Sequence, residues 1–346
     1  MSSAVLQVRT AGPLVSFQDG GRPGLMRFGV PASGPMDRFT HAAANVALGQ
    51  PTGSTAIEVS LGGVSVTCSA APVTVAICGG GFTVDHAGER CPSWTVRTLV
   101  PGDTLDIAAG PWGSWCYLAV AGDLAAHRWL GSTSTHARSN LGGGAVRAGD
   151  DVLVHAAEVR EAHEGPVVPP PSGRPSNELR VVLGPQLECF RPDAAAVLLG
   201  STYALTAASD RMGVRLAGPA LPIDDALAIP STPIVRGSLQ VSGDGASTLL
   251  LADHQTTGGY PKIATVIGDD VDQATQLRAG DEVRFVEVDP AAAVRAARAA
   301  DIARSLHLAA VADRPGLRTR ELLSTNLIGG VFRPGTDPSA GEDGPR

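Results

Sequence analysis

Side chains that can donate, accept or carry a proton are concentrated in one short stretch of this chain, residues 249–267. Ten consecutive positions supply an acid, a histidine, an amide, two hydroxyls, a phenol and a cation, namely Asp253, His254, Gln255, Thr256, Thr257, Tyr260 and Lys262. Lys262 is the only lysine of the chain. Gly258 and Gly259 allow a positive φ, and Pro261 stiffens the turn that follows them. We interpret the stretch as a candidate ligand site, with an ordinary polar hairpin tip as the alternative.

The segments on either side of these groups must hold them in place. Residues 249–252 and 263–267 are short, uncharged and rich in branched side chains, which is typical of buried strands. We therefore predict a β-hairpin whose connecting loop carries the candidate site.

Length, charge and composition limit the class of protein. A chain of 346 residues exceeds the usual size of one hydrophobic core, and 43% apolar residues suffice to fill two domains. A formal net charge of -7 argues against a nucleic-acid surface, and neither a long apolar run nor a signal-type N-terminus indicates a membrane. We expect a globular cytoplasmic protein. Scattered histidines, cysteines without CxxC spacing and the lack of a P-loop predict no metal site, free thiols and no Walker-type ATP site on this chain.

Short branched strands alternate with Gly, Pro and Asp turns in two halves of the chain. A Gly-Asp turn precedes an alternating strand at Asp103, Asp150 and Asp281, and the last two of these turns stand near the end of each half. We infer a mainly β protein with two related antiparallel β-barrels, few short helices and a C-terminal helix. The predicted boundaries are a first barrel over 1–158, a proline-rich linker over 159–177, a second barrel over 178–288, a C-terminal helix and extension over 289–332, and a disordered tail over 333–346.

A glycine- and proline-rich segment, residues 18–36, precedes a predicted helix over residues 37–48. Apolar side chains are interleaved through the segment, so we expect it to pack against the protein. Asp19 and Arg22 could form a pair that locks it over the helix start at Asp37, where the helix dipole favours an acid. This junction also has the geometry of an anion site, although most such junctions bind nothing.

Hydroxyl groups gather in a second segment, residues 130–144, which contains Ser132, Thr133, Ser134, Thr135 and His136. A hydroxyl beside a histidine could be a nucleophile with its base, but no GxSxG turn and no assigned acid accompany them. We therefore expect a hydroxyl-rich surface loop.

Longer motifs extend over nearly the whole chain, from residue 6 to residue 288. They are Gln18-Asp19 with Gly21-Arg22-Pro23-Gly24, Gly29-Val30-Pro31 with Gly34 to Arg38, Tyr117 to Gly122, Gly131-Ser132-Thr133-Ser134-Thr135, Ser209-Asp210-Arg211-Met212-Gly213 with Arg215-Leu216, Gly237-Ser238-Leu239-Gln240-Val241, and Ala252-Asp253 with Gln255 to Lys262. With these motifs the chain resembles the allophanate hydrolase subunit 2 family, also called the biotin-dependent carboxyltransferase-like family or the family of the C-type 5-oxoprolinase subunits. The resemblance implies cyclophilin-like β-barrels and work beside partner subunits. His254 departs from the family, in which arginine is usual at this position.

The resemblance also implies activation of a lactam or ureide, with ATP used by the assembled complex. Such chemistry needs groups that hold a planar amide on both edges and stabilise negative charge on its oxygen. Gln255 could read the amide edge, and Lys262 and Arg211 could face the negative charge. Asp253 could act as general base or orient the substrate. The expected catalytic residues are Asp253, Gln255, Lys262 and Arg211, and the expected substrate-binding residues are Thr256, Thr257, Gly258, Gly259, Tyr260, Asp19, Arg22 and Asp37.

Three functions remain open at this point. The leading hypothesis is a subunit of an ATP-dependent amidohydrolase that cleaves 5-oxoproline to glutamate. Its partners would be a subunit 1-type protein (allophanate hydrolase subunit 1, the B-type 5-oxoprolinase subunit) and a LamB/YcsF-type protein (the A-type 5-oxoprolinase subunit). The second is transfer of a carboxyl group from carboxybiotin to a urea-like nitrogen, with biotin carried by another polypeptide, because Lys262 stands in Tyr-Pro-Lys-Ile and not in an Ala-Met-Lys-Met-like turn. The third is a regulatory protein that antagonises a kinase inhibitor. A peptidyl-prolyl isomerase fits less well, because a shared barrel does not carry function with it.

Overall fold

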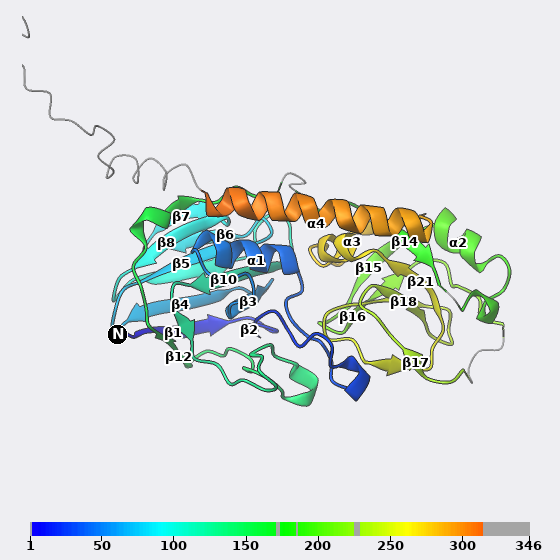
Figure 1. Cartoon of the computed structure of the whole chain (residues 1–346), viewed down its shortest axis with the longest axis horizontal. Helices are drawn as coiled ribbons and strands as arrows, with labels where there is room; N and C mark the ends of the chain where they lie inside the picture. The colour runs from blue at the N-terminus through cyan, green and yellow to red at the C-terminus, as the bar shows by residue number, and fades with distance from the viewer. Residues whose placement is uncertain (1, 171–173, 185, 225–228, 314–346) are drawn as a thin grey trace, which may run out of the picture.

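The computed structural model describes residues 2–170, 174–184, 186–224 and 229–313. Two β-rich halves lie side by side, and one long helix, α4 (Pro290–Ala312), runs along both of them (Figure 1). The predicted mainly β class and the C-terminal helix are confirmed. The remainder of the predicted C-terminal extension and the predicted tail lie outside the described residues.

Two antiparallel sheets form the first half. The first has the strand order β11 (Asp123–Leu124), β12 (Asp151–His155), β1 (Ala4–Ala11), β4 (Val64–Ser69), β9 (Thr104–Ala108), β6 (Thr83–His86), β7 (Glu89–Pro92). The second has the order β13 (Gly165–Pro166), β8 (Thr95–Leu99), β5 (Val73–Cys78), β10 (Trp115–Val120), β3 (Ala56–Ser60), β2 (Ser16–Gln18). Because β13 pairs with β8, part of the predicted linker belongs to this half.

The burial pattern of each strand depends on whether one or both of its faces are covered by other parts of the protein. In β4 buried and half-buried residues alternate, because one face lies on the core between the sheets. Every residue of β5 and β10 is buried, because helix α1 (Arg38–Ala47) packs alanines against their other face. Asp37 begins α1 as its N-cap, and its carboxylate accepts the N–H of Thr40 at 3.0 Å.

The second half is a closed barrel that surrounds its own core. Its strand order is β14 (Glu178–Leu183), β21 (Lys262–Val266), β18 (Ser238–Val241), β19 (Ser247–Leu250), β16 (Gly213–Ala217), β15 (Thr202–Ser209), β22 (Glu282–Glu287). All pairs are antiparallel except β14 and β22, which close the barrel in parallel. The remaining described elements are the two-stranded ribbon β17 (Thr232–Pro233) and β20 (Thr257–Gly258), helices α2 (Ala194–Gly200) and α3 (Gly268–Ala274), and the 3-10 turns η1 (Met26–Phe28), η2 (Ala137–Ser139), η3 (Glu161–His163) and η4 (Leu187–Cys189).

The Gly-Asp turns found in the sequence have the same geometry at all three places. The carboxylates of Asp103, Asp150 and Asp281 each accept the backbone N–H three residues earlier, at 2.9, 2.8 and 2.8 Å. The glycine before each aspartate has a positive φ, of 102°, 91° and 93°. Each turn therefore starts its strand, β9, β12 or β22, in the same way.

The predicted hairpin around residues 249–267 is wrong. β19 and β21 do not pair with each other, because β18 lies between them and bonds to both. The connection between β19 and β21 therefore crosses one end of β18, where side chains of the connection can meet those of β18.

No helix among the described residues is long and apolar enough to cross a membrane.

Candidate functional site

Three motif segments of the second half meet at a cleft of about 320 Å³, which we call the amide cleft. They are the turn from β15 into β16, strand β18 with its neighbour β19, and the connection from β19 to β21. The lining residues are Ala208, Asp210, Met212, Gly213, Arg215, Gln240, Ser242, Thr248, Leu250, Gln255 and Tyr260.

Two glutamine amides form the polar wall of the amide cleft. Gln255 Nε2 donates to Gln240 Oε1 at 3.1 Å, and Gln240 Nε2 donates to the carbonyl of Tyr260 at 3.4 Å. A Cβ atom on Gly258 would lie 2.9 Å from Gln240 Nε2 and 2.6 Å from Ile234 Cδ1, so only glycine lets the loop approach these amides. Each amide keeps further donor and acceptor capacity, which suits a flat amide or ureide ligand. Tyr260, with 49% of its surface exposed, supplies an aromatic ring at the cleft.

The two charged side chains that line the amide cleft are already engaged. Asp210 accepts the backbone N–H groups of Met212 and Gly213 at 2.8 and 3.2 Å. Arg215 is paired with Asp244. The cleft is therefore built to bind and orient a polar planar group, and a proton-transferring group would have to come from beside it.

Arg211 and Asp253, both expected to act on substrate, are buried and bonded to each other. Arg211 Nε and Nη2 donate to the carboxylate of Asp253 at 2.9 and 3.1 Å. Arg211 Nη1 also pairs with Glu58 of β3, and Nη2 donates to the carbonyl of Gly34 at 2.6 Å. The pair is therefore a bridge between the two halves, placed directly behind the turn that carries Asp210 and Met212 into the amide cleft.

A hydrogen-bond network continues from this bridge into the first half. Tyr117 Oη donates to Glu58 Oε2 at 2.8 Å and accepts the backbone N–H of Asp37 at 2.8 Å. Burial raises the pKa of Glu58, an effect that the charge of Arg211 opposes. Burial and the neighbouring carboxylates of Glu58 and Asp37 raise the pKa of Tyr117, so this phenol stays protonated and can donate.

Lys262 lies on β21, away from the lining of the amide cleft. Its ammonium donates to Thr232 Oγ1 at 2.6 Å, and its backbone N–H donates to Gln186 Oε1 at 3.0 Å. Burial lowers the pKa of Lys262, of which 8% is exposed. Thr232 belongs to the ribbon strand β17, which pairs with Thr257 and Gly258, so Lys262 is held beneath that ribbon.

The other expected residues of the connection lie around this ribbon. The carbonyl of Thr256 accepts the N–H of Ile234 at 3.1 Å, and Thr257 is exposed opposite Pro233. Gly259 approaches the carbonyl of Ile229. Nδ1 of His254 lies within hydrogen-bond distance, 2.7 Å, of the carbonyl oxygen of Gln255, and burial lowers the pKa of His254.

Asp19 and Arg22 lie in the first half and do not reach the amide cleft. Asp19 accepts the hydroxyls of Ser132 and Ser134 at 2.5 and 2.7 Å, and Arg22 donates to the carbonyl of Ser134 at 2.5 Å. Burial raises the pKa of Asp19, but these hydroxyls and two backbone N–H groups outweigh burial and hold the pKa below its usual value. The expectation of a hydroxyl-rich surface loop is wrong, because residues 132–136 are buried and Asp19 and Arg22 bond to residues 132–134.

Asp37 lies outside the amide cleft as well. Its carboxylate caps α1 and accepts the amide of Gln276 at 2.9 Å, which joins α1 to the end of α3. Burial, followed by the charge of Asp272, raises the pKa of Asp37. Within the described residues, no group of three His, Cys, Asp or Glu side chains could hold a metal ion.

Sequence reasoning missed Gln240, Glu58 and Tyr117 as members of this site and its support. A signal existed for Glu58, because it is the single charged residue in the buried strand AIEVS and such an acid needs a partner. Gln240 stood in the quoted motif Gly237–Val241, but nothing in the sequence indicated that it faces Gln255, which it does because β18 separates β19 from β21.

A family model described as the carboxyltransferase domain, subdomain A and B, matches residues 28–287. The C-type subunit of the 5-oxoprolinase of Haemophilus influenzae is 31% identical over 276 residues, 79% of this chain and 88% of that protein. The urea amidolyase of Saccharomyces cerevisiae is 27% identical over 81% of this chain, which corresponds to 16% of that protein.

Solved structures share the fold. The crystal structure of TTHA0988 has a TM-score of 0.73 and 32% identity, covering 82% of this chain and 55% of that one. The Kluyveromyces lactis urea carboxylase has a TM-score of 0.77 at 22% identity, covering 89% of this chain and 29% of that one. These matches confirm the resemblance found in the motifs, and the chain belongs to the family of carboxyltransferase domains built from subdomains A and B.

Proposed function

We propose that this chain is the C-type member of a heteromeric, ATP-dependent 5-oxoprolinase that converts 5-oxoproline, ATP and water to glutamate, ADP and phosphate in the cytoplasm. Its partners are a subunit 1-type protein, which is the B-type member, and a LamB/YcsF-type protein, which is the A-type member. The observation that carries the proposal is the pair of facing amides, Gln240 and Gln255, in a cleft large enough for a small lactam. The relationship to the C-type 5-oxoprolinase subunit of Haemophilus influenzae, over most of both chains, supports the choice of substrate.

In this proposal Gln255 and Gln240 hold the N–H and C=O edges of the lactam, and the ring of Tyr260 covers its flat face. Thr257 and the backbone at Gly258 and Gly259 form the rim. Lys262 lies outside the lining of the cleft, bonded to Thr232 of the ribbon, and its positive charge acts through that rim on the carbonyl that becomes negative. Arg211 and Asp253 act as positioning residues, because their bridge fixes the turn that forms one wall of the cleft.

ATP is bound by the assembled complex and not by the amide cleft. The charged lining residues of the cleft are Asp210 and Arg215, and Arg215 is already paired with Asp244, so this donor set does not fit a triphosphate. When bound, ATP would supply the phosphoryl group that activates the carbonyl. Lys262 does not fit the role of a biotin-bearing lysine, because its ammonium is buried and bonded to Thr232.

Transfer of a carboxyl group to a urea-like nitrogen is the second candidate. The kinship with urea amidolyase over 81% of this chain favours it, and urea presents the same planar donors and acceptors as a lactam. Carboxybiotin would then arrive on another polypeptide.

Co-expression of this chain with the two partner types tests the proposal. Size-exclusion chromatography of subunit 1-type protein and this chain should give one larger species, whereas two independent peaks at micromolar concentration would contradict a stable complex. The purified complex should release glutamate from 5-oxoproline only when ATP is present. Fixation of carbonate onto urea with a biotinylated partner would instead support the second candidate, and a complex without either activity would support a regulatory role.

A matched pair of variants tests the amide cleft within that assay. Gln255→Glu replaces an amide donor with a negative charge and should lower turnover ten- to a thousandfold, the scale of a lost stabilising contact. Gln7→Glu makes the same change on an exposed position of β1 and should leave turnover unchanged. Equal turnover in both variants would show that the amide cleft is not part of the active site.

A further inference from the structure

A second cavity lies where α1, α3 and α4 meet, and its volume is about 330 Å³. Among the described residues, it shares no lining side chain with the amide cleft. The rings of Phe39, Trp94 and Trp112 line it, and the small residues Gly80 and Ala300 leave its space open. Small-molecule sites have volumes of roughly 300–1,000 Å³ and mostly apolar, aromatic walls with a few polar groups. The cavity therefore has the size and lining of a ligand site.

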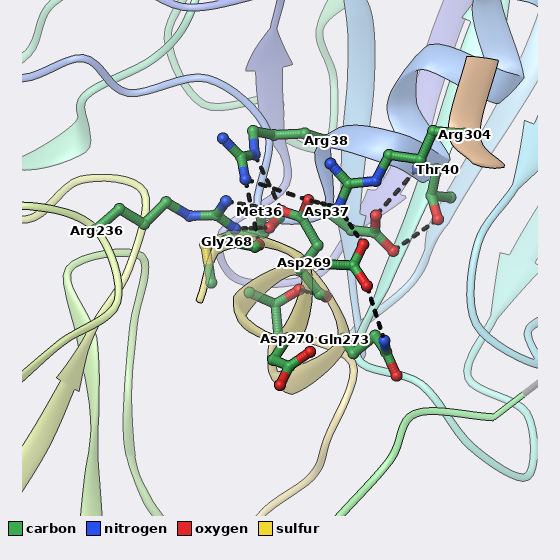
Figure 2. Close-up of polar contacts among 12 residues, drawn as sticks. Met36, Asp37, Arg38, Thr40, Arg236, Gly268, Asp269, Asp270, Gln273 and Arg304 are labelled. Atoms are coloured by element: carbon green, nitrogen blue, oxygen red, sulfur yellow. Dashed lines mark hydrogen bonds and ion pairs between the residues drawn. The ribbon is translucent and has the colours of Figure 1, made fainter. Parts of the chain in front are cut away.

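A cluster of arginines and aspartates joins α3 and α4 (Figure 2), and its members Asp269, Asp272 and Arg304 line one side of this cavity. Asp272 accepts hydrogen bonds from Arg38 at 3.1 Å, Arg236 at 2.7 Å and Arg304 at 2.9 Å. Arg304 of α4 also donates to Asp269 Oδ1 at 2.6 Å. The charge of Asp272 is therefore fully compensated, and α4 is fixed in place beside the cavity.

Two carboxylate oxygens among the lining groups of the cavity keep accepting capacity. Within the described part of the chain, Asp37 Oδ1 accepts one N–H, that of Thr40, and Asp269 Oδ2 has only a 3.5 Å contact from Gln273 and a 4.0 Å contact from Arg180. A carboxylate oxygen accepts two hydrogen bonds with ease, so both atoms can take an N–H from a ligand.

We propose that this cavity binds a flat, uncharged heteroaromatic ring that carries an amino group, such as an aminopurine. The aromatic walls favour a flat ring, because stacked and edge-on aromatic contacts add to the burial of apolar surface. The acceptor oxygens of Asp37 and Asp269 favour amino N–H donors on its edge. Arg174 and Arg304 also line the cavity, so a ligand with a full positive charge would meet like charge as well as opposite charge.

Isothermal titration calorimetry with adenine on the full-length chain tests this site. A ring of this size should bind with a dissociation constant of roughly 0.1–1 mM. Unsubstituted purine, which lacks the amino group, should bind at least fivefold more weakly. Adenosine identifies the source of the ring: tighter binding than adenine assigns the site to a nucleoside, and weaker binding assigns it to the free base.

Two leucine substitutions on α4 locate the binding. Ala300→Leu fills the cavity and should weaken adenine binding at least tenfold, whereas Ala299→Leu, on the exposed side of the helix, should not change it. Adenine should also quench tryptophan fluorescence in the wild type, and Trp112→Phe should remove part of that quenching. If Ala300→Leu does not fold, the Trp112→Phe titration decides: loss of part of the quenching supports the proposal, and quenching equal to that of the wild type overturns it. No saturable heat at millimolar adenine, or equal affinity in the two leucine variants, would overturn the proposal.

Discussion

Replacing Arg211 with methionine should destabilise the protein far more than the loss of an ordinary ion pair. Arg211 makes two hydrogen bonds to Asp253, one to the carbonyl of Gly34 and a pairing with Glu58, and its side chain is 4% exposed. Methionine keeps most of the volume but leaves two buried carboxylates without their cation. Removing one partner of a buried ion pair costs about 3–5 kcal/mol. That is a large part of a total stability of about 5–15 kcal/mol, so Arg211→Met should fold but unfold at much lower urea concentration.

The loss in free energy of unfolding caused by Arg211→Met should also depend on pH. Burial already raises the pKa of Glu58, and Arg211→Met removes the charge that opposes this rise, so Glu58 binds protons more tightly in the folded state than in the unfolded state, where carboxyl pKa values are about 4. A pKa that is raised on folding gives stability at low pH that is lost as the pH rises. The free energy lost relative to wild type should therefore be smaller at pH 5 than at pH 8.

Urea denaturation followed by far-UV circular dichroism, at both pH values, measures these quantities. Arg215→Met is the matched control, since its pairing with Asp244 joins two side chains that are 49% and 57% exposed and should contribute little to stability because solvent screens it. Adding Glu58→Gln and Asp253→Asn to Arg211→Met should recover about 1 kcal/mol or more, because neutral amides replace unpaired charges. A loss in Arg211→Met no larger than in Arg215→Met, or one that is equal at both pH values, would refute the bridge as the source of stability.

Three further outcomes are expected. Arg22→Ala should lower the melting temperature or the assembly with subunit 1-type protein more than Arg298→Ala, because Arg22 is buried on carbonyls of the 132–136 segment while Arg298 is exposed on α4; indistinguishable behaviour would make Arg22 a solvated side chain. Lys262→Met should lower turnover of the assembled complex ten- to a thousandfold and should not lower the melting temperature, because burial already lowers the pKa of Lys262 and its charge is held at a cost; wild-type turnover with a lower melting temperature would make it a scaffold residue. Burial lowers the pKa of His41 to about 4, so between about pH 6.5 and 4 the unfolded state binds more protons than the folded state. The stability of the wild type should therefore fall as the pH falls through that range. In thermal melts at several pH values, His41→Gln should show a shallower fall, and parallel curves for the two proteins would contradict a lowered pKa of His41.

Local features of the fold were predictable from the sequence, and contacts between distant segments were not. The three Gly-Asp turns and the helix that starts after Asp37 rest on bonds within a few residues, so their sequence signals were sufficient. The pairing of Arg211 with Glu58 spans 153 positions and depends on how the halves meet. The same reason explains the segment at residues 132–136, whose hydroxyls indicate a surface unless Asp19, more than 100 positions away, is known to accept them.

The candidate site was predictable in part. The stretch from Asp253 to Lys262 does supply two residues of the amide cleft, Gln255 and Tyr260. The neighbours in sequence nevertheless separate in space, because Asp253 turns inward to Arg211 while Lys262 continues into β21 beneath the ribbon. Spacing along a chain identifies a group of residues, but strand order decides which of them face the same space.

The parallel pair β14–β22, which closes the second barrel, also determines when during synthesis the barrel can close. Glu178 at its start pairs with Arg284 near its end, so β14 cannot find this partner until about 100 further residues have been synthesised. At about 5–20 residues per second on the ribosome, its edge stays unpaired for roughly 5–20 s. The sheets of the first half are complete before that, while an open strand edge is a site of association with other chains. Early contact with a chaperone should therefore improve the yield of this chain mainly through its second half, because it covers this edge until Arg284 has been synthesised.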